Sequence, residues 1–330
     1  MLFRIDRIST ILVTGCAGFI GSNLVDQLLK NNYKVIGLDN LSTGNSQFIQ
    51  DALNHKNFAF HEVDLLHSPN IEEFFYDCDL VFHFAANADV RYGVDKPGVD
   101  FEQNTHVTFK VLEAMRISGV KKICFSSTGS IYGESSLIPT PETAPFPIQT
   151  SLYGASKLAC EGMISAYCES FGFQAWIFRF VSILGPRYSH GHVFDFYKQL
   201  LVNPDSLKVL GDGNQKKSYL HVLDCISGIE FGMMNFNDKV NVINLGHNSY
   251  ISVKESINFM STELNVYPSI KYGTEDRGWI GDNPFIFLDT DKINSVGWAP
   301  KFSIERGVID TVNYLKENSW LFSEINNYEF

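Results

Sequence analysis

The chain has 330 residues, a formal net charge of -11 at pH 7, 45% hydrophobic residues and 19% charged residues. This balance is typical of a globular protein with a large core. The acidic charge argues against non-specific binding of nucleic acid, because no basic stripe is present to meet phosphates. No apolar run approaches the roughly 18 residues of a membrane span, and the first residues lack the pattern of a signal peptide.

Short apolar runs alternate with segments of helical spacing over the first 180 residues. Strands are predicted at 11–14, 34–38, 58–62, 80–84, 122–126 and 175–180, and helices at 19–30, 71–76, 104–118 and 153–171. Such alternation predicts a Rossmann-type α/β fold, in which a doubly wound parallel sheet has helices on both faces.

The pattern becomes mixed after residue 180. Strands are predicted at 208–210, 219–222, 242–245 and 286–288, and helices at 193–201, 222–234, 252–264 and 304–317. We therefore expect a larger unit over residues 1–180 and a smaller mixed α/β lobe over 181–330, closely packed and partly interleaved with the first. The six cysteines form no CxxC pair, so free buried thiols in a reducing cytoplasm are expected.

A glycine-rich turn follows the first predicted strand and opens the first helix. Gly15, Gly18 and Gly21 form a GxxGxxG pattern, which allows a tight turn, a close approach of pyrophosphate and close helix packing. Asp39 lies 24 residues after Gly15, where a carboxylate suits the ribose hydroxyls and repels a 2′-phosphate. The pattern predicts an NAD site. Asp64, after the third strand, is expected either to contact adenine or to cap the next turn.

Tyr153 and Lys157 form a YxxxK pattern on one face of a predicted helix. An ammonium beside a phenol favours phenolate, so we expect the pKa of Tyr153 to fall from about 10 toward neutrality. The tyrosine would then serve as a general acid or base. Thr128 ends a strand in a hydroxyl-rich turn, where it is placed to bind a substrate hydroxyl. A structural helix and an ordinary polar turn are the alternatives.

Together these motifs resemble the extended short-chain dehydrogenase/reductase family, in particular its NAD-dependent nucleotide-sugar epimerases and dehydratases. Further shared motifs are DNLSTG at 39–44, HFAA at 83–86, GPR at 185–187 and RGWIGD at 277–282. The resemblance implies that residues 1–180 bind NAD and carry catalysis, that 181–330 bind the nucleotide sugar, and that segments 104–118 and 153–171 form a homodimer. It implies NAD contacts from Gly15, Gly18, Phe19, Ile20, Gly21, Asp39, Asn40, Ser42, Gly44, Asp64, Leu65, Phe84, Ala85, Ala86, Asn104, Ser126, Tyr153, Lys157 and Phe180.

The resemblance also implies a reaction. Tyr153 would take a proton from a sugar hydroxyl, assisted by Thr128, while NAD accepts hydride from the same carbon. The 4-keto sugar would turn over and receive hydride on its other face. Related 4,6-dehydratases carry Thr-Asp-Glu where this chain has Thr-Gly-Ser at 128–130, which disfavours that route. We therefore expect a UDP-glucose 4-epimerase-like enzyme; a dehydratase, a decarboxylase, a net 4-dehydrogenase and a non-catalytic NAD sensor are the alternatives.

Two departures from the family pattern leave the sugar and the nucleotide open. Ser182 stands where the family often has asparagine, and Lys217-Ser218 replaces the usual Arg-Asp. Substrate contacts are expected from Thr128, Ser182, Arg187, Lys217, Arg277 and Asp282. Of these, Lys217 and Arg277 are candidates for the diphosphate or, alternatively, surface charges.

No metal site is expected, because His190 and His192 lack further ligands nearby. These histidines, with Arg91 and Tyr92, are candidates for sugar contacts or for simple packing.

Overall fold

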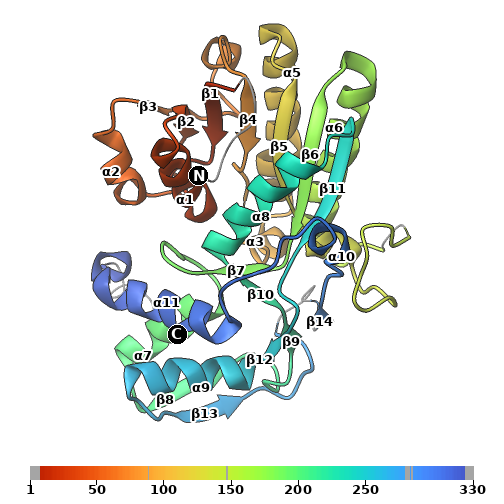
Figure 1. Cartoon of the computed structure of the whole chain (residues 1–330). Coiled ribbons are helices and arrows are strands. Elements are labelled where there is room, and N and C mark those ends of the chain that lie inside the picture. The colour runs from red at the N-terminus through yellow and green to blue at the C-terminus, as the bar shows by residue number, and fades with distance from the viewer. Residues whose placement is uncertain (1–7, 88, 146–147, 279–282, 284, 324–330) are drawn as a thin grey trace.

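The computed structural model describes residues 8–87, 89–145, 148–278, 283 and 285–323. A large sheet with helices on both faces forms the upper part of the molecule in Figure 1, and a smaller group of helices and short strands lies below it. Within the described residues, every helix is too short or too polar to span a bilayer.

The large sheet has seven strands in the order β11-β6-β5-β4-β1-β2-β3, and every pair is parallel. The strands are β1 (Thr10–Thr14), β2 (Lys34–Asp39), β3 (Phe58–Glu62), β4 (Leu80–His83), β5 (Lys122–Thr128), β6 (Gln174–Phe180) and β11 (Val240–Leu245). The strand order reverses between β1 and β4, which is the arrangement of a doubly wound sheet. The predicted Rossmann-type fold is thereby confirmed.

Helices α1 (Phe19–Lys30) and α8 (Val222–Asn235) cover one face of the sheet, and α5 (Val107–Ser118) and α6 (Leu152–Phe171) cover the other. Strand β1 shows how its pleat divides the core. Ile11 and Val13 pack with the α1 and α8 side chains, whereas Leu12 between them packs with those of α5 and α6. The sheet is therefore buried on both faces, as the continuous apolar runs predict.

Two helices differ from the sequence prediction. The segment predicted as a helix from residue 104 begins as a π-helix at Phe101–His106 before α5 starts. In this wide turn the Asn104 side chain bonds with Asn87 and Ser156 outside the helix. The predicted helix at 71–76 is a short 3₁₀ helix at Ile71–Phe74, too short to form a regular α-helix.

The smaller lobe contains three short sheets, which pair β7 with β10, β9 with both β12 and β14, and β8 with β13. Its strands are β7 (Ser182–Leu184), β8 (Ser206–Val209), β9 (Lys216–Lys217), β10 (Tyr219–His221), β12 (Ile251–Ser252), β13 (Ser269–Tyr272) and β14 (Phe285–Ile286). Its helices are α7 (His192–Val202), α9 (Val253–Leu264) and α11 (Ile304–Glu317), whereas α10 (Asp291–Asn294) packs against β11 of the large sheet. Short helices elsewhere are α2 (Gln50–Leu53), α3 (Tyr92–Asp95) and α4 (Gly98–Asp100).

The large sheet draws its seventh strand, β11, from the half of the chain beyond residue 180, together with the covering helix α8. Residues 181–330 thus contribute to both parts of the molecule. The division at residue 180 into two binding units stays a prediction.

Candidate active site

A cavity of about 580 Å³ lies at the carboxyl ends of the central strands. It begins at the glycine turn after β1, passes the ends of β2, β4, β5 and β6, and reaches Lys217 in the smaller lobe. This is the edge of a doubly wound sheet at which ligands bind, next to the point where the strand order reverses.

The glycine turn is shaped by close backbone contacts. Gly15 has a φ of +71°, and a Cβ there would lie 2.7 Å from the backbone nitrogen of Ala85. A Cβ on Gly21 would collide with the Gly15 carbonyl. Helix α1 begins at Phe19, and its N-cap residue, Gly18, offers no side-chain hydrogen bond to the first amides. This cradle fits a pyrophosphate, which backbone amides and the positive helix end would bind.

Asp39 lies buried at the end of β2, where its carboxylate accepts hydrogen bonds from the amides of Ala17 and Leu41, each at 2.9 Å. Burial raises the pKa of Asp39, and the amide bonds oppose this shift. Asp64 also lines the cavity, and it accepts bonds from the amides of Leu66 at 2.8 Å and His67 at 3.2 Å. Asp64 thus caps the turn that follows β3 and also lines the cavity, while its contact with adenine stays a prediction.

The three predicted catalytic residues lie together. Thr128 ends β5 close to Tyr153, which lies in the first turn of α6. The Thr128 hydroxyl itself donates to the Ser130 hydroxyl at 3.2 Å. Both side chains line the cavity. Lys157 lies one turn further along α6, buried, and its ammonium donates to the Ser126 carbonyl at 2.9 Å. A hydroxyl pair therefore faces the cavity with a buried cation behind it.

The predicted fall in the pKa of Tyr153 is not seen in this structure. Burial raises the pKa of this phenol well above its usual range, Asp100 and Cys160 raise it further, and the Thr128 hydroxyl opposes the shift. The cost of taking a phenolate out of water dominates, because the Lys157 ammonium is directed at a carbonyl. Burial lowers the pKa of Lys157 to about 8.

All the predicted cofactor residues line the cavity except Asn104 and Lys157. Asn104 is buried behind it, accepting from the Asn87 amide at 2.8 Å and donating to the Ser156 hydroxyl at 2.9 Å. It therefore ties the segment after β4 to α6 rather than lining the cavity.

The predicted substrate residues divide into two groups. Thr128, Ser182 and Lys217 line the cavity. Arg187 does not, because its guanidinium donates to Asp26 of α1 at 2.7 Å. Arg277 is also absent from the lining and forms an ion pair with Glu134 at 2.7 Å. Asp282 lies outside the described residues.

Several lining residues were missed by the sequence analysis. They are mostly small and polar, and include Asp89, Gln103, Ser127, Ser130, Thr150, Ser151, Ser189 and Asn283. The hydroxyl pair at 150–151, directly before Tyr153, was a usable signal, since Ser151 also caps α6. Ser127 and Ser130 belong to the hydroxyl-rich turn around Thr128 that the sequence indicates. The others lie on separate segments and carry no pattern of their own.

Three further candidates, His190, His192 and Arg91, differ in their surroundings. His190 lines the cavity, whereas His192 bonds with the Ser256 hydroxyl at 2.8 Å. Arg91 is held between Asp89 at 3.1 Å and Asp195 at 3.0 Å. Among the residues described, no group of three or more His, Cys, Asp or Glu side chains is arranged to hold a metal ion.

Residues 11–246 match the NAD dependent epimerase/dehydratase family, and the chain belongs to that family. It is 35% identical to a putative UDP-glucose 4-epimerase of Methanocaldococcus jannaschii, over 94% of this chain and 99% of that one. A crystal structure of UDP-galactose 4-epimerase superposes with a TM-score of 0.83 at 33% identity, covering 94% of this chain and 100% of that one. A crystal structure of UDP-glucuronic acid 4-epimerase from Bacillus cereus, in complex with UDP-glucuronic acid and NAD, superposes with a TM-score of 0.85 at 28% identity. The match covers 93% of this chain and 99% of that one.

The predicted family is thereby confirmed, and the protein is an NAD-dependent nucleotide-sugar enzyme. The glycine cradle and Asp39 fit this cofactor, since the turn has room for a pyrophosphate and a carboxylate at the end of β2 lines the same cavity, where it would suit the ribose hydroxyls.

Proposed function

We propose that the protein interconverts two nucleotide-diphosphate sugars that differ in configuration at C4, with UDP-glucose and UDP-galactose as the first candidates. The observation that carries this proposal is the Thr128–Tyr153 hydroxyl pair, which faces the same cavity as the glycine cradle. The cavity thus brings an acid–base group and the cofactor site together. Relatives with 4-epimerase names over nearly their full length support the same reaction.

In this mechanism the chain moves the proton of one sugar hydroxyl. Tyr153 takes the O4 proton, directly or through Thr128, and later returns it. Lys157 lies one helical turn behind Tyr153, and burial lowers its pKa to about 8. In this structure its ammonium donates to the Ser126 carbonyl, so it does not offset the burial that raises the pKa of Tyr153. When bound, NAD supplies reversible hydride acceptance at C4. Loss of one proton and one hydride leaves a 4-keto sugar, and rotation of this sugar in the cavity allows either epimer to form.

The strand-end turn supports epimerisation over 4,6-dehydration. Gly129 and Ser130 follow Thr128 in a 3₁₀ helix, and neither carries a carboxyl group that could eliminate water. Lys217, at the far end of the cavity, is our candidate for the diphosphate, because an ammonium suits an anionic bridge.

The test is incubation of the purified protein with UDP-glucose, UDP-galactose, UDP-GlcNAc and a panel of GDP-, CDP- and dTDP-sugars, followed by NMR and by absorbance of NADH. Interconversion at C4 without net NADH is the expected result. A 4-keto-6-deoxy product, released CO₂ or accumulating NADH would replace the proposal with dehydration, decarboxylation or net oxidation.

We further propose a homodimer formed by the outer faces of α5 and α6. Phe101, Phe109 and Leu152 are 61%, 43% and 47% exposed there. Small side chains follow one face of α6 at helical spacing, which lets a partner helix approach closely: Ala155, Ala159, Gly162 and Ala166. Phe109→Glu should give monomers in light scattering, whereas Leu201→Glu, on the exposed surface of α7, should leave the dimer intact.

The proposed location is the cytoplasm, where nucleotide sugars would be supplied for polysaccharide biosynthesis. All six cysteines are free and buried, which is compatible with a reducing compartment.

A further inference from the structure

Helix α6 is joined to β5 by three contacts in a row. Three consecutive residues at the end of the strand each lie against one residue of the helix, the first two through hydrogen bonds. The three helix residues are spaced one turn apart on one face. The contacts pair Ser126 with Lys157, Ser127 with Glu161, and Thr128 with Tyr153. The first and last involve residues of the proposed mechanism. The middle contact, from the Ser127 hydroxyl to Glu161 at 2.5 Å, has no chemical role in it.

Glu161 is held in one orientation by a second partner. The Arg179 guanidinium on β6 donates from Nε to one Glu161 carboxylate oxygen at 3.1 Å and from Nη2 to the other at 2.7 Å. This two-point contact is rigid, and both side chains are largely removed from water. The Glu161 carboxylate is therefore bonded to residues of both β5 and β6.

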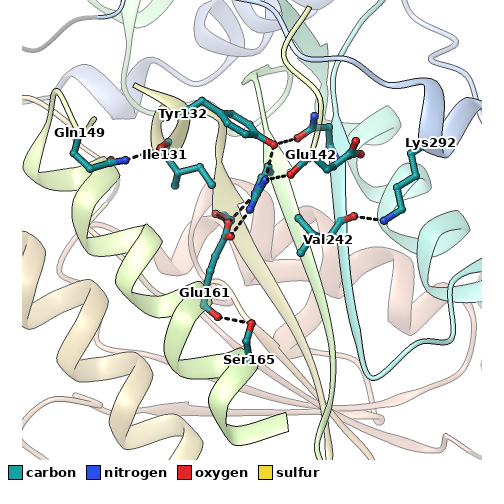
Figure 2. A network of polar contacts seen from close by, with 11 residues as sticks. Ile131, Tyr132, Glu142, Gln149, Glu161, Ser165, Val242 and Lys292 are labelled. Atoms are coloured by element: carbon teal, nitrogen blue, oxygen red, sulfur yellow. Dashed lines mark hydrogen bonds and ion pairs between the residues drawn. The ribbon is translucent and has the colours of Figure 1, made fainter. Parts of the chain in front are cut away.

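Arg179 is also held on the side away from Glu161; Figure 2 labels Tyr132, Glu142 and Glu161, the residues that its guanidinium joins. Its Nη1 donates to the Tyr132 hydroxyl at 2.6 Å and to the Glu142 carbonyl at 3.1 Å. The Tyr132 hydroxyl donates onward to Asn244 of β11 at 2.9 Å. The network thus extends from the catalytic helix across three strands, and it has little freedom to rearrange.

We propose that Glu161 is a positioning residue, which sets the register of α6 on β5 and thereby holds Tyr153 within reach of Thr128. This inference rests on the proposed function. Glu161 does not line the cavity, so it acts only through the helix. A buried ion pair usually adds little to the free energy of unfolding, because desolvation offsets the attraction between the charges. We therefore assign the Glu161–Arg179 pair the role of fixing the position of α6. A displacement of about 1 Å at a reacting group costs roughly 100-fold in rate, so a small slip of α6 is enough.

Two variants of the NAD-loaded, 330-residue protein test the proposal. Glu161→Gln keeps the side-chain length and weakens the hydrogen bonds to Arg179. Ser127→Ala removes the hydroxyl that bonds to Glu161 and keeps the ion pair. Because Ser127 also lines the cavity, KM and hydrogen exchange are measured beside kcat. The matched control is Glu169→Gln, which alters an exposed ion pair with Lys239 on the same helix. We expect kcat to fall about 100-fold in Glu161→Gln and about tenfold in Ser127→Ala, with KM unchanged and the control at the wild-type rate.

Hydrogen exchange of residues 152–157 gives a readout that needs no turnover. In this turn the Gly154 amide bonds to the Ser151 hydroxyl at 3.0 Å, and exchange there should accelerate in both variants but not in the control. Wild-type rates of turnover and exchange in Ser127→Ala would overturn the inference, as would a rise in KM alone. If the wild-type protein turns over no nucleotide sugar, the proposed function fails, while the exchange experiment still decides the role of Glu161.

Discussion

Replacement of Gly15 by alanine tests whether the cradle at the start of α1 needs a residue without a Cβ. Gly15 has a φ of +71°, which costs an L-residue about 1–2 kcal/mol. The added Cβ would lie 2.7 Å from the Ala85 nitrogen, and overpacking of this kind costs a further 1–3 kcal/mol, roughly. We expect a total loss of about 2–5 kcal/mol in the free energy of unfolding, measured in urea. NAD affinity, measured by calorimetry, should fall at least about tenfold, because the turn must move to admit the methyl group.

Gly119 provides the matched control, because it has the same kind of backbone without the close contact. Its φ is +83°, a Cβ there would meet nothing within 4 Å, and it does not line the cavity. Gly119→Ala should therefore show only the backbone cost of about 1–2 kcal/mol and wild-type NAD affinity. Equal losses of stability in the two variants, with unchanged NAD affinity in both, would refute the argument from close approach.

Three further predictions concern charge and proton transfer. Tyr153→Phe should lower kcat by about 10²–10⁴-fold and leave NAD affinity intact, and retained turnover would remove this residue from the mechanism. Burial depresses the pKa of Lys157 from 10.5 to about 8, so the unfolded chain binds more protons between these values and stability should rise with pH across that window. Urea unfolding should show a smaller rise in Lys157→Met, and an identical rise would contradict the assignment. Asp39→Asn should narrow the preference for NAD over NADP in direct binding, and an unchanged ratio would show that the carboxylate does not select the cofactor.

Residue spacing in the sequence was sufficient to predict a feature where all of its residues lie in one short segment. The turn from Gly15 to Gly21 needs particular residues at particular intervals, so its place at the head of α1 was readable from the chain. The YxxxK pair was readable for the same reason, because a helix places residues four apart on one face. The apolar runs predicted the parallel sheet, since strands buried on both faces have no polar side.

The tertiary structure alone decided which charges reach the cavity and which are neutralised elsewhere. Arg187 pairs with Asp26 and Arg277 pairs with Glu134, and no local pattern marks partners so far apart in the chain. Burial reversed the expected shift in the pKa of Tyr153, because desolvation depends on everything that packs around a group. The chain by itself determined the sheet, the glycine turn at the head of α1 and the helix face shared by Tyr153 and Lys157, since these follow from backbone geometry and short spacing. Folding decides which partner each charged side chain meets, because the partners lie far apart in the sequence. The bonds of Glu161 to residues of β5 and β6 are an example.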